Sequence, residues 1–239
     1  MSLQKEIHSM RGTQIKIEKK EVYRYLGYVR VEPEQSVKEL VTACIEEMAH
    51  VAAPKSQYQI LDIKVPKKGE TMQLGFAEVH SSSLAKNLAD CEKMLLVGAT
   101  IGPRPDLLIQ KYSRTDPLKG VIMQAVGAML IESYLDERNE TLRQRMWKEG
   151  YRLHPRFSPG YGDFALEYQR DIFRVLDCGS ALGLTLMDSL IMAPSKSVTA
   201  VIGMEPLKGE ECQKPYTHKH IPQPDRCAAC TNTDCSFKA

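Results

Sequence analysis

Apolar residues recur at two spacings along the chain, and the two spacings predict different elements. After Pro33, apolar positions three and four residues apart share one face and predict a helix through about His50. The apolar positions of this helix are Val37, Leu40, Val41, Cys44, Ile45 and Met48. Residues 58–65 alternate between apolar and polar, and residues 93–100 form a continuous apolar run. We expect both segments to be strands, the second of them central in a sheet.

The clearest helix start is Asp116-Pro117, a capping acid followed by a proline that suits the first helical turn. Apolar residues at helical spacing follow and predict a long helix to about residue 136. Within it, Gly127-Ala128 would let a neighbouring element approach closely. A second, charged helix is expected over residues 139–150.

The remaining pattern predicts shorter elements. Residues 13–32 indicate a strand at the edge of a core, and residues 72–76 are expected to form a hairpin with 58–65 through the turn 67–70. Ser81-Ser82-Ser83 would cap a helix toward Asp90.

In the last third of the chain, the spacing of apolar residues predicts a helix from about Asp163 to Leu176. Two strands, 182–192 and 197–204, are expected after it. Strands and helices in this mixed order favour an α+β fold over a doubly wound sheet.

The composition is that of an ordinary folded protein, with 43% hydrophobic and 26% charged residues and a net charge of +2 over 239 residues. No long basic stripe is present, so nucleic acid is not an expected partner. The start of the chain has no apolar core for a signal peptide, and the run 94–101 is too short to span a membrane. We therefore expect a cytoplasmic protein with no membrane partner.

From residue 206 the composition changes, which divides the chain into a domain over 1–205 and a cysteine-rich tail over 206–239. Cys227, Cys230 and Cys235 have the spacing C-x₂-C-x₄-C, and Cys212 lies upstream. Four thiolates suit zinc or an iron–sulfur cluster, whereas a redox or free-thiol role would explain the same residues without a metal. The other three cysteines, Cys44, Cys91 and Cys178, are expected in the core.

The segment 156–163 combines turn chemistry with side chains that suit a small ligand. Arg156 can hold a carboxylate, Pro159-Gly160 makes a tight turn, and Tyr161 supplies a ring and a hydroxyl. Asp163 is expected to cap the helix that follows. The pattern alone is explained as well by a plain turn before a helix and does not name a ligand.

Residues 116–204 resemble the activation domain of cobalamin-dependent methionine synthase. The resemblance is carried by the long helix that ends Tyr134-Leu135-Asp136-Glu137-Arg138 and by the loop Arg156…Pro159-Gly160-Tyr161. The Leu184-Thr185 strand and the segment from Met192 to Thr199 match as well, and Arg24-Tyr25-Leu26-Gly27-Tyr28 is the clearest match in the first half.

This resemblance implies a curved α+β domain that binds S-adenosylmethionine (AdoMet) in a shallow, extended site. The domain would present the methyl group to a cobalamin held elsewhere, so that inactive cob(II)alamin is reduced and remethylated. Carried onto this chain, the ligand contacts would be Arg156 for the carboxylate, the backbone around Phe157, Ser158 and Gly160, the side chain of Tyr161, and Glu132 near the cationic group.

Two residues depart from the family pattern. Gly162 stands where a proline is expected after the tyrosine, and Met129 could occupy the register of the family's helix carboxylate in place of Glu132. The chain has no Asp-x-His-x-x-Gly motif for cobalamin and no Gly-x-Gly-x-x-Gly motif for a Rossmann-type site.

The resemblance therefore implies a free-standing activation domain that acts on a separate corrinoid-binding methyltransferase, with flavodoxin or ferredoxin as a possible electron donor. Two alternatives stay open at this point. One is a non-catalytic metal-binding protein that docks a corrinoid protein, and the other is an electron carrier built on the cysteine tail.

Overall fold

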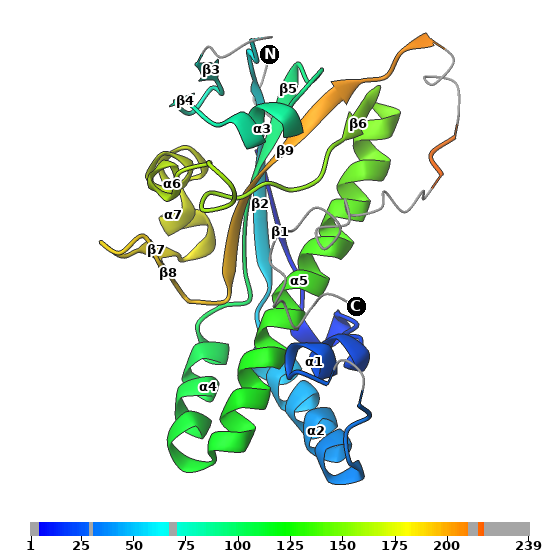
Figure 1. The fold of residues 1–239 in the computed structure, drawn as a ribbon, viewed down its shortest axis with the longest axis vertical. Helices are drawn as coiled ribbons and strands as arrows, with labels where there is room; N and C mark the ends of the chain where they lie inside the picture. Colours follow the sequence, from blue (N-terminus) through cyan, green and yellow to red (C-terminus); the bar gives the residue numbers. More distant parts are fainter. Residues whose placement is uncertain (1–4, 29–30, 67–70, 210–214, 218–239) are drawn as a thin grey trace.

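A computed structural model describes residues 5–28, 31–66, 71–209 and 215–217 (Figure 1). Its centre is a five-stranded sheet in the order β1-β2-β5-β9-β6, with every neighbouring pair antiparallel. The strands are β1 Lys5–Ser9, β2 Lys55–Asp62, β5 Lys93–Thr100, β6 Tyr151–Leu153 and β9 Ser197–Pro206. The sheet curls into a half-barrel. The expected α+β fold and the central position of β5 are confirmed.

One face of the sheet is covered by helices that include the longest of the described chain (Figure 1). They are the short 3₁₀ turn η1 Gly12–Gln14, α1 Lys19–Tyr25, α2 Gln35–Val51, α4 Arg104–Thr115 and α5 Pro117–Lys148. Leu95 and Val97 of β5 point into this first core, where they join α5 side chains such as Val126 and Leu130. The predicted helix over 36–50 is confirmed as α2.

The opposite face carries a second core under shorter elements. They are β3 Met72–Gln73, β4 Glu78–Val79, α3 Ser82–Asn87, η2 Leu166–Tyr168, α6 Gln169–Leu176, α7 Cys178–Leu182, β7 Thr185–Leu186 and β8 Met192–Ala193. Met94 and Leu96 of β5 point this way, because successive side chains of a strand face opposite sides. One strand therefore supplies both cores.

Two predictions about the helices are wrong. Helix α5 continues without a break through residues 137–139, because the segment contains helix-forming residues and no glycine or proline to end it. Residues 13–32 contain helix α1 and not a strand, since Val22 and Leu26 lie one helical turn apart against the core. Helix α4 was not predicted, because its prolines Pro103 and Pro105 resemble a turn although both lie at a helix start.

The smaller strands also differ from expectation. β3 pairs with β4, and only an isolated bridge from Lys64 to Gln73 connects it toward β2. The expected turn over 67–70 lies outside the described residues. The segment 182–192 is not one strand, because α7 ends at Leu182 and the short hairpin β7–β8 follows.

The three cysteines expected in the core are there. Cys44 and Cys178 are fully buried and Cys91 nearly so. Burial raises the pKa of Cys44 to about 11 and the pKa of Cys91 and Cys178 to about 12. These thiols are therefore protonated at neutral pH and poorly reactive.

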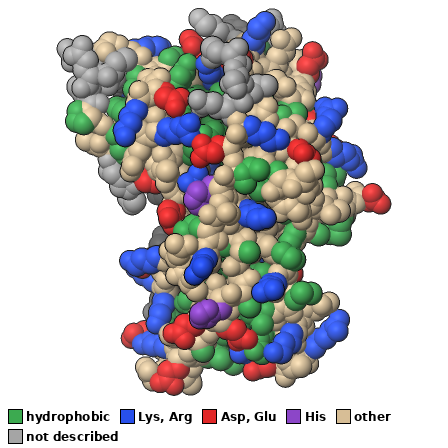
Figure 2. Space-filling view, turned by 180° about the vertical axis from the view of Figure 1, so that it is seen from behind, with side chains coloured by type: hydrophobic (Ala, Val, Ile, Leu, Met, Phe, Trp, Pro, Cys, Tyr) green, Lys and Arg blue, Asp and Glu red, His purple; other side chains and the backbone are tan. Residues whose placement is uncertain are grey.

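The surface does not concentrate one sign of charge on the face in Figure 2, where basic and acidic side chains are interspersed. Among the described helices, only α5 is long and apolar enough to span a membrane, and 56% of its apolar window is buried inside the protein. Its packing against α2, α4 and β6 identifies it as a core helix.

Candidate functional site

The loop after β6 is attached to the edge of the sheet by backbone hydrogen bonds. The N–H of His154 donates to the carbonyl of Gly203 at 2.9 Å. Phe157 and Val201 exchange both of their backbone bonds, at 2.9 and 2.8 Å. The loop is therefore positioned by β9, and the following residues start from a fixed backbone.

Residues 158–161 form the tight turn that the sequence predicts. The N–H of Tyr161 donates to the carbonyl of Ser158 at 3.2 Å, and Gly160 has φ = 90°. Proline at the second position and a positive-φ glycine at the third are the requirements of a type II turn. The N–H groups of Phe157, Gly160 and Tyr161 all donate to protein carbonyls. A ligand edge at this turn would therefore meet carbonyl oxygens and side chains.

Arg156 joins this loop to helix α5. Its Nη2 lies 2.9 Å from Oε2 of Glu132 and 3.1 Å from Oδ1 of Asp136. Its Nη1 is buried and has no hydrogen-bond partner among the described residues. The structure thus brings Arg156 and Glu132 together, as expected, and adds Asp136. The sequence carried a signal for Asp136, because it lies four residues after Glu132 on one helix face.

The three side chains differ in their access to solvent. The Arg156 side chain is 19% exposed, whereas Glu132 and Asp136 are 50% and 65% exposed. The guanidinium of Arg156 is thus mostly buried, whereas the carboxylates of Glu132 and Asp136 are accessible to solvent. A buried N–H without an acceptor is uncommon in folded proteins. The three side chains place one guanidinium beside two exposed carboxylates, and these groups can pair with a carboxylate and a cation of a ligand.

Asp163 does not cap the helix that follows it, which begins only at Gln169. Its Oδ1 accepts from Ser81 Oγ at 2.6 Å and from the N–H of Ser83 at 3.0 Å, and its Oδ2 accepts from the N–H of Ser82 at 2.7 Å. These hydrogen bonds hold the pKa of Asp163 well below its usual range, and the bond from the Ser81 hydroxyl has the largest effect. The carboxylate caps α3 and connects the loop to that helix.

Gly162, where a proline was expected, has a backbone conformation that excludes proline. Its φ is +55°, which the proline ring cannot adopt. A Cβ at this position would lie 2.8 Å from Ser83 Oγ. The close approach of the loop to α3, where Asp163 makes its bonds, thus requires glycine.

The segment 193–198 lies against α4 and the first half of α5. Asp106 accepts hydrogen bonds from both the N–H and the hydroxyl of Ser195, at 2.6 and 2.8 Å. Lys196 crosses α5 at Gly127, where the expected close approach is found, and its Nζ donates to Gln124 at 2.8 Å. Burial lowers the pKa of Lys196.

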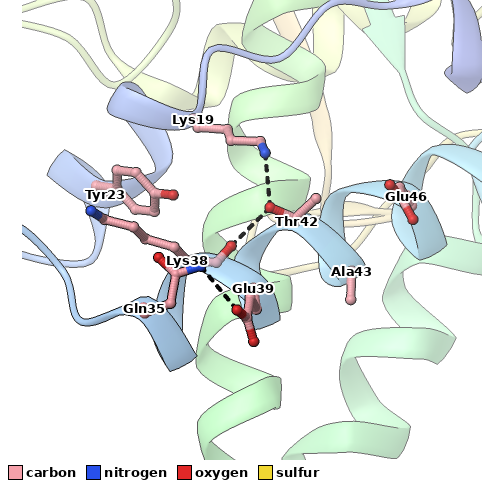
Figure 3. A pocket seen from close by; sticks show the side chains of 8 residues that line it. All are labelled: Lys19, Tyr23, Gln35, Lys38, Glu39, Thr42, Ala43 and Glu46. Atoms are coloured by element: carbon pink, nitrogen blue, oxygen red, sulfur yellow. Dashed lines mark hydrogen bonds between the residues drawn. The ribbon is translucent and has the colours of Figure 1, made fainter.

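A hollow in the surface lies elsewhere, between α1 and α2 (Figure 3). Its lining residues are Lys19, Tyr23, Gln35, Lys38, Glu39, Thr42, Ala43 and Glu46. Lys19 donates to Thr42 at 2.8 Å, and Gln35 donates to Glu39 at 2.9 Å. The hollow is open, its polar groups bind one another, and it includes no residue of the Arg156 loop. We therefore place the candidate site at Arg156.

The four cysteines of the expected metal site, Cys212, Cys227, Cys230 and Cys235, lie outside the described residues, so this site remains a prediction. Within the described ranges, no group of three or more His, Cys, Asp or Glu side chains could hold a metal ion. Tyr216 is described and is anchored on α5. Its hydroxyl donates to Glu140 at 3.0 Å, and its ring meets Trp147 edge-on at 5.8 Å.

No family model matches the chain, and no curated protein matches it in sequence. Several chains of solved structures match in fold, and among them is the MetH reactivation domain bound to AdoHcy, with a TM-score of 0.61 and 12% sequence identity. The match covers 87% of this chain and 80% of that chain. The two proteins therefore share their architecture across most of their length.

Proposed function

We propose that this protein binds AdoMet at Arg156 and acts as the reactivation partner of a separate corrinoid methyltransferase. The observation that carries this proposal is the Arg156–Glu132 pair beside the type II turn, on a fold similar to the MetH reactivation domain. That solved domain holds AdoHcy, which is AdoMet without its transferable methyl group. We further propose that the protein is soluble and cytoplasmic.

The geometry suits the amino-acid end of AdoMet, which carries one carboxylate and one ammonium group. Arg156 would donate to the carboxylate, and Glu132 would face a cationic group. Phe157, Ser158 and Gly160 would border the rest of the ligand, and the half-exposed ring of Tyr161 would pack on it. The role of these residues is to bind and orient the methyl donor.

The cobalamin would be held by the partner and would supply the nucleophile that receives the methyl group. An electron donor of the flavodoxin or ferredoxin class would provide the single electron that reduction of cob(II)alamin requires. We assign to residues 5–209 the presentation of AdoMet and the docking of the partner.

The first test is isothermal titration calorimetry with AdoMet on the wild type and Arg156→Ala. We expect micromolar or weaker binding by the wild type and at least about a tenfold loss in the variant, because a charge-assisted pair with a carboxylate is removed. Arg174→Ala is the matched control, since it removes an exposed arginine that pairs only within α6. Equal AdoMet affinity in wild type and Arg156→Ala would contradict the site assignment. A cob(II)alamin remethylation assay with a candidate partner then tests the reactivation role.

A second proposal concerns the tail, for which we propose a zinc ion or an iron–sulfur cluster held by Cys212, Cys227, Cys230 and Cys235. The contact of Tyr216 with α5 supports a position of this tail near the Arg156 site. Its partner Glu140 lies four residues after Asp136 on α5, a rise of about 6 Å along the helix. Cys227, Cys230 and Cys235 therefore follow in sequence a residue that is anchored close to the Arg156 site.

Anaerobic purification followed by metal analysis tests this second proposal. A brown protein that absorbs near about 400 nm indicates an iron–sulfur cluster. A colourless protein with stoichiometric zinc indicates a structural zinc site and removes the electron-carrier alternative. We expect the double substitution Cys227→Ser, Cys230→Ser to abolish either metal. Wild-type protein with neither metal would rule the proposal out.

A further inference from the structure

We infer that the protonated imidazole of His154 is a positioning group for Arg156, and that AdoMet binding weakens when this imidazole loses its proton. The inference rests on the proposed function and makes the affinity of that site depend on pH. His154 lies two residues before Arg156, directly after β6 and at the start of the loop.

Both ring nitrogens of His154 face oxygen atoms. Nδ1 lies 2.6 Å from the backbone oxygen of Asn87, the last residue of α3, and Nε2 lies 3.2 Å from Oε2 of Glu205 on β9. A carbonyl and an ionised carboxylate can only accept hydrogen bonds, so both nitrogens must carry a proton for both bonds to form. A neutral imidazole has one N–H and keeps only one of the two bonds. The arrangement is therefore that of a doubly protonated His154.

Helix α3 binds the loop at both of its ends. The carboxylate of Asp163 accepts from the first N–H groups of the helix, and His154 binds the carbonyl of its last residue. The side chain of Asn87 also donates to the carbonyl of Pro155 at 3.2 Å. An anion at the start of a helix and a cation at its end both match the partial charges of the helix termini. The segment 154–163 is thus attached to α3 by two groups of opposite charge.

Among the described residues, β9, β6 and the turn before β5 bring charged or titratable groups to this imidazole. Glu205 of β9 also pairs with Arg152 of β6, whose Nη1 lies 3.4 Å from the same carboxylate oxygen. In the turn, Cys91 Sγ lies 3.6 Å from Nδ1 of His154, and Asp90 is close to the thiol. Burial raises the pKa of Cys91 to about 12, so the thiol stays protonated. Histidine is the side chain of this group that changes charge between about pH 5 and 8.

Loss of this proton weakens the attachment of the backbone that precedes Arg156. The His154 and Glu205 side chains are only 20% and 23% exposed, so water replaces a lost hydrogen bond poorly. The guanidinium of Arg156 reaches α5 from this backbone, and a less fixed backbone holds it less well for a ligand carboxylate. The charged form has the better partners, so its contribution is complete at low pH and is lost as pH rises. We therefore expect AdoMet affinity to fall as pH rises.

The test is calorimetric titration with AdoMet of the wild type and His154→Gln, between about pH 5.5 and 8.5. Glutamine keeps one donor group but does not titrate. We expect the wild type to bind roughly three- to tenfold more tightly than the variant at the low end, because a charge-assisted hydrogen bond is present only there. The ratio of the two affinities should approach about one at the high end. The ratio is the quantity to compare, because an α-amino group such as that of AdoMet also titrates near about pH 8.

His50→Gln is the matched control, because it makes the same change at an exposed position at the end of α2. It should bind AdoMet like the wild type at every pH. Glu205→Gln keeps His154 but removes the carboxylate that faces Nε2, so it should lose most of the excess affinity at low pH. This second variant carries the test if His154→Gln does not fold.

Two outcomes separate this inference from the proposed function. A ratio of wild-type to His154→Gln affinity that stays constant over the pH range would overturn the inference and leave the proposed function intact. A Glu205→Gln variant with the pH dependence of the wild type would do the same. Absence of AdoMet binding by the wild type at every pH would overturn both.

Discussion

At the scale of single residues, side chains of the 156–163 loop bind elements that are distant in sequence. Asp163 shows this most clearly, because it reaches back across 80 or more positions to cap α3. Arg156 makes the equivalent connection back to α5 through Glu132 and Asp136. The loop is thus held from two sides, and its turn can keep one shape with or without a ligand.

The first prediction concerns the pH dependence that Asp163 produces. Its pKa is lowered in the folded state, so its contribution to stability is complete above its unfolded pKa of about 4 and is lost as pH falls below that value. We expect Asp163→Asn to lower the melting temperature at pH 7. The difference from wild type should shrink as pH falls from about 5 to 3, measured by circular dichroism.

Asp188→Asn is the control for this prediction, because it makes the same change at an exposed position outside the loop. It should leave both the melting temperature and its pH dependence close to those of the wild type. A wild-type-to-Asp163→Asn difference that is constant between pH 7 and 3 would show that the carboxylate is not the cause.

At the scale of elements, the hairpin of helices α4 and α5 carries the acidic half of the site on a rigid support. The two helices cross where Gly120 lies against the backbone of Ser113. A Cβ on Gly120 would lie 2.9 Å from the Cα and N of Ser113, neither of which can move alone. Asp116 begins α5 between them and accepts from the N–H of Lys119 at 3.1 Å. Glycine is therefore required at this crossing.

We predict that replacing a helical glycine by alanine changes the free energy of unfolding differently at positions 120 and 179. Gly120→Ala should destabilise the fold by about 1–2 kcal/mol, because the cost of overpacking exceeds the gain in helix propensity. Gly179→Ala, in α7, should be neutral or stabilise by up to about 1 kcal/mol, since a Cβ there meets nothing nearer than 3.8 Å. Urea unfolding followed by circular dichroism measures both. Equal effects of the two substitutions would contradict the assigned close approach.

At the scale of the whole molecule, one sheet separates two cores that depend on the same strands. Leu95 and Leu96 are neighbours on β5 and are both fully buried, yet they lie in different cores. A change that displaces β5 in one core also displaces the β5 side chains that pack in the other core. The domain should therefore unfold as one unit although its helices lie in two groups.

Alanine substitutions on the two faces of β5 test this coupling. We expect Leu95→Ala and Leu96→Ala each to cost about 2–5 kcal/mol and each to shift a single unfolding transition. Fluorescence of the single tryptophan, Trp147, and far-UV circular dichroism should give coincident curves. Leu118→Ala, at an exposed position, should change stability by less than about 0.5 kcal/mol. Separate transitions for the two leucine variants would refute the coupling.

The sequence alone determined those elements whose signal is local. The Asp116-Pro117 start, the α2 helix, strands β5 and β9 and the Pro159-Gly160 turn were all predicted, because caps, periodicity and turn residues act within a few positions. Arg156 and Glu132 were named from the resemblance, and their roles in ligand binding stay a prediction. The break predicted after residue 136 was wrong, because residues 137–139 contain neither glycine nor proline to end α5.

Only the tertiary structure decided which groups meet. It brought Asp136 to Arg156, turned Asp163 from the following helix to α3, and required glycine at position 162. The physical reason is that ion pairs, caps and close backbone contacts between distant segments depend on how the sheet and helices are arranged in space. A linear pattern records residue types and spacing, whereas the pairing of Arg156 with Glu132 and Asp136 depends on distances that only folding sets.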